Sequence, residues 1–224
     1  GKFGYKASEM RGYVQSTRAH NTIEVDGKNS GDCFSRDPNV AYGSAVKQAL
    51  ATDWGCVISG SLTHANLAVK HTRHLVYAYK KWLLVIDRLA SDSHHDFTQW
   101  FHFSPHLDVV SEGELQFGAE LSSGKHLSVI TGAHAKLSAS MVKGQLKPVR
   151  QGWISQAYGT LTPNVALGYS QSGKSALFVT LLSIDDIGSS INTDENLIEL
   201  SVLNKERGER LVIEFEGELC RVDW

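Results

Sequence analysis

His74-Leu-Val-Tyr-Ala-Tyr-Lys80 decides the fold class together with the segment directly after it, Lys81-Trp-Leu-Leu-Val-Ile-Asp87. The second segment is almost continuously apolar, which is typical of a strand that is buried on both faces. The two segments together predict an antiparallel β-hairpin that lies inside a larger sheet.

The rest of the chain continues this pattern. Short apolar or alternating runs recur roughly every 8–12 residues, separated by Gly, Asn, Asp or Ser. We expect all-β architecture, a large antiparallel two-sheet β-sandwich of the supersandwich type. Among the predicted strands, Trp82–Leu89 and Thr98–Phe103 are separate, as are Asn164–Ser170 and Ser175–Ser183. Only residues 41–50 have a composition that a helix would tolerate.

Composition limits the classes of function. The 224 residues fit a single domain over 1–224, and 42% hydrophobic residues supply a core. A net charge of −2 predicts neither nucleic-acid nor membrane-surface binding. No run approaches the roughly 18 apolar residues of a membrane span. Because the chain begins with Gly rather than Met, we expect a fragment or a processed chain.

The segment from Arg11 to Gly27 carries the candidate chemistry. It reads Arg11-Gly-Tyr-Val-Gln-Ser-Thr-Arg-Ala-His20-Asn-Thr-Ile-Glu-Val-Asp-Gly27 and ends in a predicted tight Asp-Gly turn. A histidine at the mouth of a strand can serve as a metal ligand or a proton acceptor, and we single out His20 for this reason. The basic residues around it suit an anionic ligand, and a solvated terminus is the alternative.

The chain contains ten histidines in all. For most of them the simplest interpretation is a histidine held by the backbone. His71 and His74 are an odd number of residues apart, so a strand would point them to opposite faces. His102 alternates with aromatic residues and is predicted to pack between sheets.

The segment Gly168-Tyr-Ser-Gln-Ser-Gly-Lys-Ser175 matches the phosphate-loop pattern G-x-x-x-x-G-K-S. Such a loop needs a helix that begins at the lysine, but residues 176–183 are rich in strand formers. We therefore predict a hairpin turn here, and we keep nucleotide binding as a distant alternative.

The segment from Arg11 to Gly27 resembles the heparinase II/III-like polysaccharide lyases, which share its Ser-Thr pair, Ala-His-Asn-Thr motif and Asp-Gly. Supporting matches follow in order over nearly the whole chain. They are His64, Val69-Lys-His71-x-Arg73, Trp82-Leu-Leu-Val-Ile-Asp87-Arg88, the stretch from His95 to Pro105, and Gly152-Trp153-x-Ser155-x-x-Tyr158-Gly159.

The resemblance implies an N-terminal α/α toroid followed by a C-terminal β-sandwich, with the active site between them. It implies cleavage of uronic-acid-containing polysaccharide by β-elimination. It also implies a zinc ion in the β part, with His20 as the third ligand. Arg11, Arg18 and Asn21 are then candidate substrate contacts, and Tyr5 is the candidate catalytic residue of this chain. For Arg18 and Asn21 the alternative is hydrogen bonding at the mouth of the strand.

The other two zinc ligands of the family pattern and the toroid would precede Gly1. One ligand alone does not hold zinc, so we expect zinc binding and catalysis only in the full-length protein. The expected partners are an acidic polysaccharide, such as a glycosaminoglycan, and the upstream toroid. The resemblance further implies a periplasmic or secreted location. The alternative function is a non-catalytic carbohydrate-binding or structural domain, in which His20 is structural.

Overall fold

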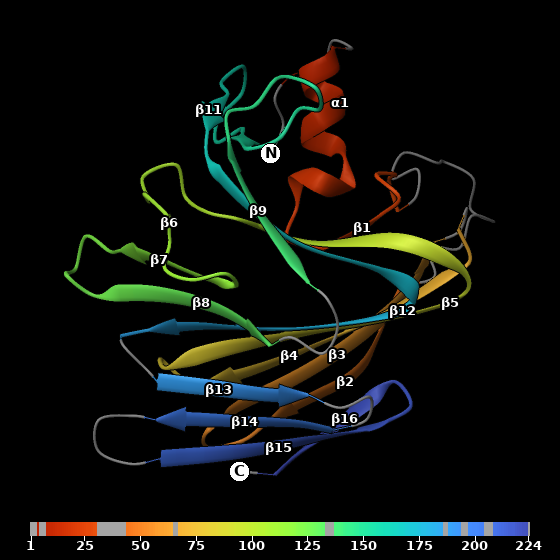
Figure 1. Ribbon diagram of the computed structural model, residues 1–224, viewed down its shortest axis with the longest axis vertical. Coiled ribbons are helices and arrows are strands. Elements are labelled where there is room, and N and C mark those ends of the chain that lie inside the picture. Colours follow the sequence, from red (N-terminus) through yellow and green to blue (C-terminus); the bar gives the residue numbers. More distant parts are fainter. Residues whose placement is uncertain are drawn as a thin grey trace.

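Two long antiparallel strands, β5 (Trp82–His102) and β12 (Val165–Ile184), lie side by side through the centre of the molecule (Figure 1). They pair along nearly their whole length, with one register shift between Gly173 and Ser175. The computed structural model describes residues 4, 8–30, 44–64, 67–132, 137–185, 188–193, 197–203 and 208–223.

In the described part of the chain, one antiparallel sheet contains ten strands, and this pair is at its centre. One half of the pair is flanked by β4, β3 and β2 beside β5, and by β8, β7 and β6 beside β12. The other half is flanked by β1 beside β5 and by β9 beside β12, and it lies above the first half (Figure 1). The flanking strands are β1 (Ile23–Val25), β2 (Ala45–Ala51), β3 (Gly55–His64), β4 (Val69–Ala78), β6 (Val110–Ser111), β7 (Gln116–Glu120), β8 (His126–Gly132) and β9 (Ser138–Lys143).

A second antiparallel sheet lies below the first one in Figure 1. Its four strands, as far as the chain is described, are β13 (Gly188–Thr193), β14 (Leu197–Leu203), β15 (Gly208–Glu216) and β16 (Leu219–Asp223). At the opposite end, the small pair β10 (Trp153–Ile154) and β11 (Thr162–Pro163) lies near the short helix α1 (Glu9–Gln15). A single 3₁₀ turn, η1 (Thr17–Ala19), follows α1.

The layers enclose two hydrophobic cores because β5 sends alternate side chains to its two faces. Leu84 and Ile86 face the lower sheet, where they join a core with β14 and β15. Val85 and Leu89 face the upper half of the large sheet, where they join a core that contains Phe97. The prediction of a strand buried on both faces is confirmed, as is the all-β antiparallel sandwich.

Two pairs of predicted strands are each a single strand in the structure. The predicted break at Gly168–Ser175 is wrong as a hairpin turn, since this segment lies within β12. Its glycines serve close packing instead. Gly168 lies opposite Trp100, and a Cβ atom there would lie 2.6 Å from the indole ring. Gly173 marks the β-bulge at which the register shifts. Lys174 lies in a strand and begins no helix, so the geometry of a phosphate loop is not formed.

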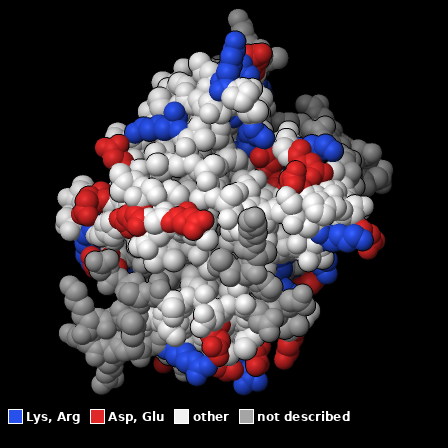
Figure 2. All heavy atoms as spheres, viewed as in Figure 1, with Lys and Arg blue, Asp and Glu red and all other residues white. Residues whose placement is uncertain are grey.

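Charge is mixed on the face that Figure 2 shows. Basic side chains at the top of this view, over α1 and β11, stand beside acidic ones. Glu9 of α1, for example, forms an ion pair with Arg150. In the described part of the chain, no helix is long and apolar enough to cross a membrane.

Candidate functional site

The turn that carries His20 links α1 to β1 and follows from local sequence. Ser8 caps α1, since its hydroxyl accepts a hydrogen bond from the backbone N–H of Arg11 at 3.2 Å. After β1, Asp26 and Gly27 have φ angles of 51° and 65°, and the N–H of Lys28 donates to the Val25 carbonyl at 2.9 Å. The predicted tight turn is confirmed.

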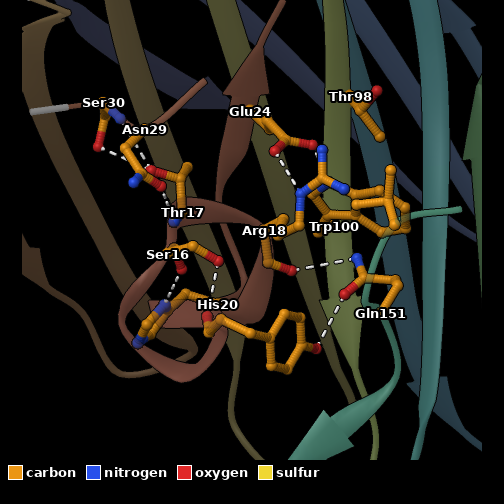
Figure 3. A network of polar contacts seen from close by, with 12 residues as sticks. Ser16, Thr17, Arg18, His20, Glu24, Asn29, Ser30, Thr98, Trp100 and Gln151 are labelled. Carbon is orange, nitrogen blue, oxygen red and sulfur yellow. Dashed lines mark hydrogen bonds and ion pairs between the residues drawn. The ribbon is translucent and has the colours of Figure 1, made fainter. Parts of the chain in front are cut away.

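The imidazole of His20 is exposed, and its Nδ1 lies 2.8 Å from the Ser16 carbonyl oxygen (Figure 3). A carbonyl oxygen only accepts hydrogen bonds, so Nδ1 carries a proton, and in the neutral ring Nε2 then carries the lone pair. Histidines that bind metals commonly donate their second ring N–H to such an oxygen. The ring therefore fits the part of one metal ligand.

A full ligand set for a metal is not formed within the part of the chain that the structure describes, because no three His, Cys, Asp or Glu side chains gather there. The zinc site implied by the resemblance therefore needs ligands beyond these residues. His20 fits such a site as one member.

Arg18 turns away from His20 toward the opposite side of the turn (Figure 3). Its Nε donates to Glu24 Oε1 at 2.7 Å, and the other carboxylate oxygen of Glu24 accepts from Trp100 Nε1 at 3.1 Å. Glu24 is buried, and the Arg18 side chain is 19% exposed. The ion pair fixes the guanidinium against the buried carboxylate of Glu24.

Asn21 is exposed, and its side chain contacts the end of β5. Its Oδ1 accepts from the backbone N–H of His102 at 2.8 Å. The amide nitrogen of Asn21 has no partner among the described residues, so it remains available to donate. His102 is half-buried, and its Nε2 lies 2.8 Å from the Arg18 carbonyl oxygen, so this ring is held by the backbone of the turn and is not packed between two sheets. Burial lowers the pKa of His102, the hydrogen bond to this carbonyl opposes the shift, and the nearby His20 adds to it.

Two residues that the sequence patterns did not single out hold this turn, Tyr13 of α1 and Gln151, which precedes β10. Gln151 Nε2 donates to the Arg18 carbonyl at 3.1 Å, and Gln151 Oε1 accepts from the Tyr13 hydroxyl at 2.9 Å (Figure 3). The same hydroxyl accepts the backbone N–H of Trp153 at 3.2 Å. The neighbouring Gly152-Trp153 pair was the only signal, and it does not predict these contacts, because Tyr13 and Gln151 are 138 positions apart.

The two other predicted site residues lie at the start of the chain. Arg11 is part of α1, and its Nη1 donates to the Gly4 carbonyl. Tyr5 lies outside the described residues. The structure thus brings Arg18, His20 and Asn21 into one turn, and it places Arg11 one helix away.

A buried carboxylate lies beneath the turn. Asp87 is 0% exposed, and Arg73 binds both of its oxygens at 2.7 Å. His71 Nε2 lies 2.6 Å from Oδ1, and Gln99 Nε2 donates to Oδ2 at 2.7 Å. Burial raises the pKa of Asp87, but the charges of Arg73 and His71 and their hydrogen bonds outweigh it and hold this pKa well below its usual range.

This carboxylate sits where the two halves of β5 face each other. Asp87 and Gln99 are twelve residues apart in one strand, and they touch because the strand turns back above the sheet. His71 faces this network, while His74 points to the opposite face and bonds Ser59 Oγ through Nδ1 at 2.8 Å. The predicted opposite orientation of these histidines is confirmed.

The fold and this turn define a β-sandwich domain with an exposed histidine at the mouth of a strand. The chain belongs to the heparinase II/III-like C-terminal family, which matches residues 1–194. No curated protein matches it.

Solved structures of a heparan sulfate lyase and of proteins named heparinase III share the fold. Heparan sulfate lyase HepC from Pedobacter heparinus is 16% identical, with a TM-score of 0.78. The match covers 97% of this chain and 34% of the HepC chain. The BT4657 gene product, a heparinase III, is 14% identical with a TM-score of 0.74, covering 96% and 34%. Another heparinase III is 13% identical with a TM-score of 0.71, covering 94% and 32%. The chain thus spans about a third of the length of these proteins.

Proposed function

We propose that this chain is the C-terminal β domain of a polysaccharide lyase, which cleaves a uronic-acid-containing acidic polysaccharide by β-elimination together with an upstream toroid domain. Family membership over residues 1–194 supports the class of enzyme. The observation that carries the proposal at the site is the exposed imidazole of His20, with Nδ1 on a backbone carbonyl and Nε2 facing outward.

The chemistry explains the residue types. In β-elimination a base removes the C5 proton of the uronate, and the electron pair of the C–H bond becomes a C4–C5 double bond. The C4–O bond breaks, and the leaving oxygen keeps its electron pair and takes up a proton. The C5 proton is acidic enough only when the uronate carboxylate is neutralised or hydrogen-bonded. A zinc ion, when bound, would supply positive charge, and His20 would be one of its ligands.

The residues of this chain would bind and orient the substrate. The amide nitrogen of Asn21, which has no partner among the described residues, can donate to a uronate carboxylate. The terminal nitrogens of Arg18 and the guanidinium of Arg11 suit carboxylate or sulfate groups. Tyr5 is proposed as the group that assists proton transfer, on the resemblance alone.

The test uses the full-length protein that contains this chain. Unsaturated uronate is followed by ultraviolet absorbance with heparan sulfate, chondroitin sulfate, hyaluronan and alginate as substrates. We expect cleavage of at least one polymer, and a loss of 10-fold or more in kcat/KM in His20→Ala. His94→Ala is the matched control, because His94 is also an exposed histidine but lies in β5 away from the turn. No cleavage of any polymer by the wild type would contradict the lyase activity, and full activity in His20→Ala would contradict the role of His20.

The second candidate is a non-catalytic carbohydrate-binding or structural domain. One observation favours it: Arg18, a predicted substrate contact, is engaged by the buried Glu24. In that case the full-length protein would retain an acidic polysaccharide on an affinity column but release no unsaturated product.

A further inference from the structure

The contact between Arg73 and the His20 segment connects the exposed turn to the centre of the sandwich. Arg73 Nη1 donates to the backbone carbonyl of Asn21 at 2.5 Å. Its other two hydrogen bonds go to the two oxygens of Asp87, both at 2.7 Å. One guanidinium therefore joins a fully buried carboxylate to the main chain directly after His20.

The geometry of this link depends on arginine. The planar guanidinium binds both oxygens of Asp87 in parallel and still presents a third N–H to the Asn21 carbonyl. A lysine has one nitrogen and no fixed fork, so it cannot make the same three contacts in fixed directions. His71 and Gln99 also bind Asp87, so the carboxylate that holds Arg73 is fixed inside the sandwich.

The other contacts of the turn hold neighbouring groups, among them the Thr22 carbonyl, which accepts from the N–H of Trp100 at 3.0 Å. Gln151 and His102 hold the Arg18 carbonyl, before His20, and the N–H of His102 holds the Asn21 side chain. In the described residues, the carbonyl of Asn21 is held by Arg73. The side chain of His20 bonds the Ser16 carbonyl through Nδ1, and its backbone bonds Thr17 and Thr22, all within the same turn.

We propose that Arg73, anchored on Asp87, is a positioning residue for His20 and Asn21: it sets the direction in which Nε2 of His20 and the amide of Asn21 face the substrate side. This inference rests on the proposed function. Arg73 is distinct from the ligands and contacts proposed above, and it acts through the backbone of residue 21.

The test compares Arg73→Lys with Arg88→Lys in the full-length protein. Arg88 is the matched control, because it also donates from Nη1 to a backbone carbonyl, that of Gly217, and lies over the Phe215 ring at 4.3 Å. Arg88 therefore contacts the lower sheet. Three quantities are measured: backbone amide exchange by mass spectrometry, zinc affinity by chelator competition, and kcat/KM on the polymer that the wild type cleaves.

In Arg73→Lys we expect exchange in peptides covering residues 16–22 to accelerate at least tenfold, with exchange in β14 unchanged. Zinc affinity and kcat/KM should each fall about 10–100-fold, as they do when an outer partner of a metal ligand is lost. Arg88→Lys should leave all three quantities at the site within about twofold. Because β14 reports global unfolding, a merely destabilised variant is recognised by faster exchange there as well.

The outcomes separate two failures. If Arg73→Lys matches Arg88→Lys in local exchange, zinc affinity and kcat/KM, while His20→Ala abolishes activity, the positioning role is overturned and the proposed function stands. If the wild type cleaves no polymer, the proposed function fails. If His20→Ala binds zinc and cleaves like an active wild type, the role of His20 fails. In both cases the positioning role falls as well, whatever the exchange rates are.

Discussion

The imidazole rings of His64 and His71 lie 6.0 Å apart, centroid to centroid, inside the sandwich. His64 is 1% exposed, and neither of its ring nitrogens has a hydrogen-bond partner among the described residues. Burial, and then the nearby His71, lower the pKa of His64 to about 4. On the opposite face of β4, burial and the charge of Arg88 lower the pKa of His74 to about 4 as well.

The lowered pKa values of His64 and His74 predict that the folded protein becomes less stable in mild acid. Each has a folded pKa of about 4 against an ordinary value of 6.5, so the unfolded chain binds more protons between these pH values. The free energy of unfolding should be highest above pH 6.5 and fall as the pH approaches 4, by up to about 3 kcal/mol for each histidine. Urea unfolding at a series of pH values measures this slope. His64→Leu should remove about half of the slope, and a flat profile in the wild type would contradict the prediction.

A pair of glycine substitutions tests the packing of the long strands. Gly168→Ala would place a Cβ atom 2.6 Å from the Trp100 ring, so we expect a loss of about 1–3 kcal/mol. Gly12→Ala, in α1, meets no atom within 4 Å and should be neutral or stabilise by up to about 1 kcal/mol. Denaturant midpoints of the two variants measure both effects. Equal midpoints for the two variants would contradict close packing between the Trp100 ring and β12.

The Tyr13 hydroxyl joins α1 to the loop before β10. Tyr13→Phe leaves the Trp153 N–H without its acceptor and removes one donor from Gln151, so a loss of about 1–3 kcal/mol is expected. Tyr79→Phe is the control, because Tyr79 is 45% exposed. Thermal unfolding should show a lower midpoint only for Tyr13→Phe.

The phosphate-loop pattern predicts nucleotide binding, and the structure predicts none, since Lys174 lies within β12. Isothermal titration with ATP and magnesium should show no submicromolar binding. Lys174→Ala should give the same trace as the wild type, and a binding signal that this variant removes would overturn our assignment of the segment.

Local patterns predicted much of the fold. The apolar run in β5 and the Asp26-Gly27 turn were recognisable because strand burial and positive φ each leave a sequence signal. The fusion of four predicted strands into β5 and β12 was not, because glycine at a bulge and glycine at a turn look alike in sequence. α1 was also missed, since seven residues with a central glycine carry too short a period to detect.

The metal, its remaining ligands, the role of Tyr5 and the location of the protein stay predictions. They depend on residues that lie outside the described part of the chain or on contacts with other molecules.

The sequence by itself determined the all-β class and the identity of the exposed turn, because both depend on neighbours a few positions apart: alternation along a strand, and the residues from Arg11 to Gly27. Only the tertiary structure decided how that turn is held. Arg73, His102 and Gln151 reach it from 52 to 133 positions away. Contacts of that range arise when strands pair and β5 turns back over the sheet, and no local pattern records where the pairing will bring two side chains together.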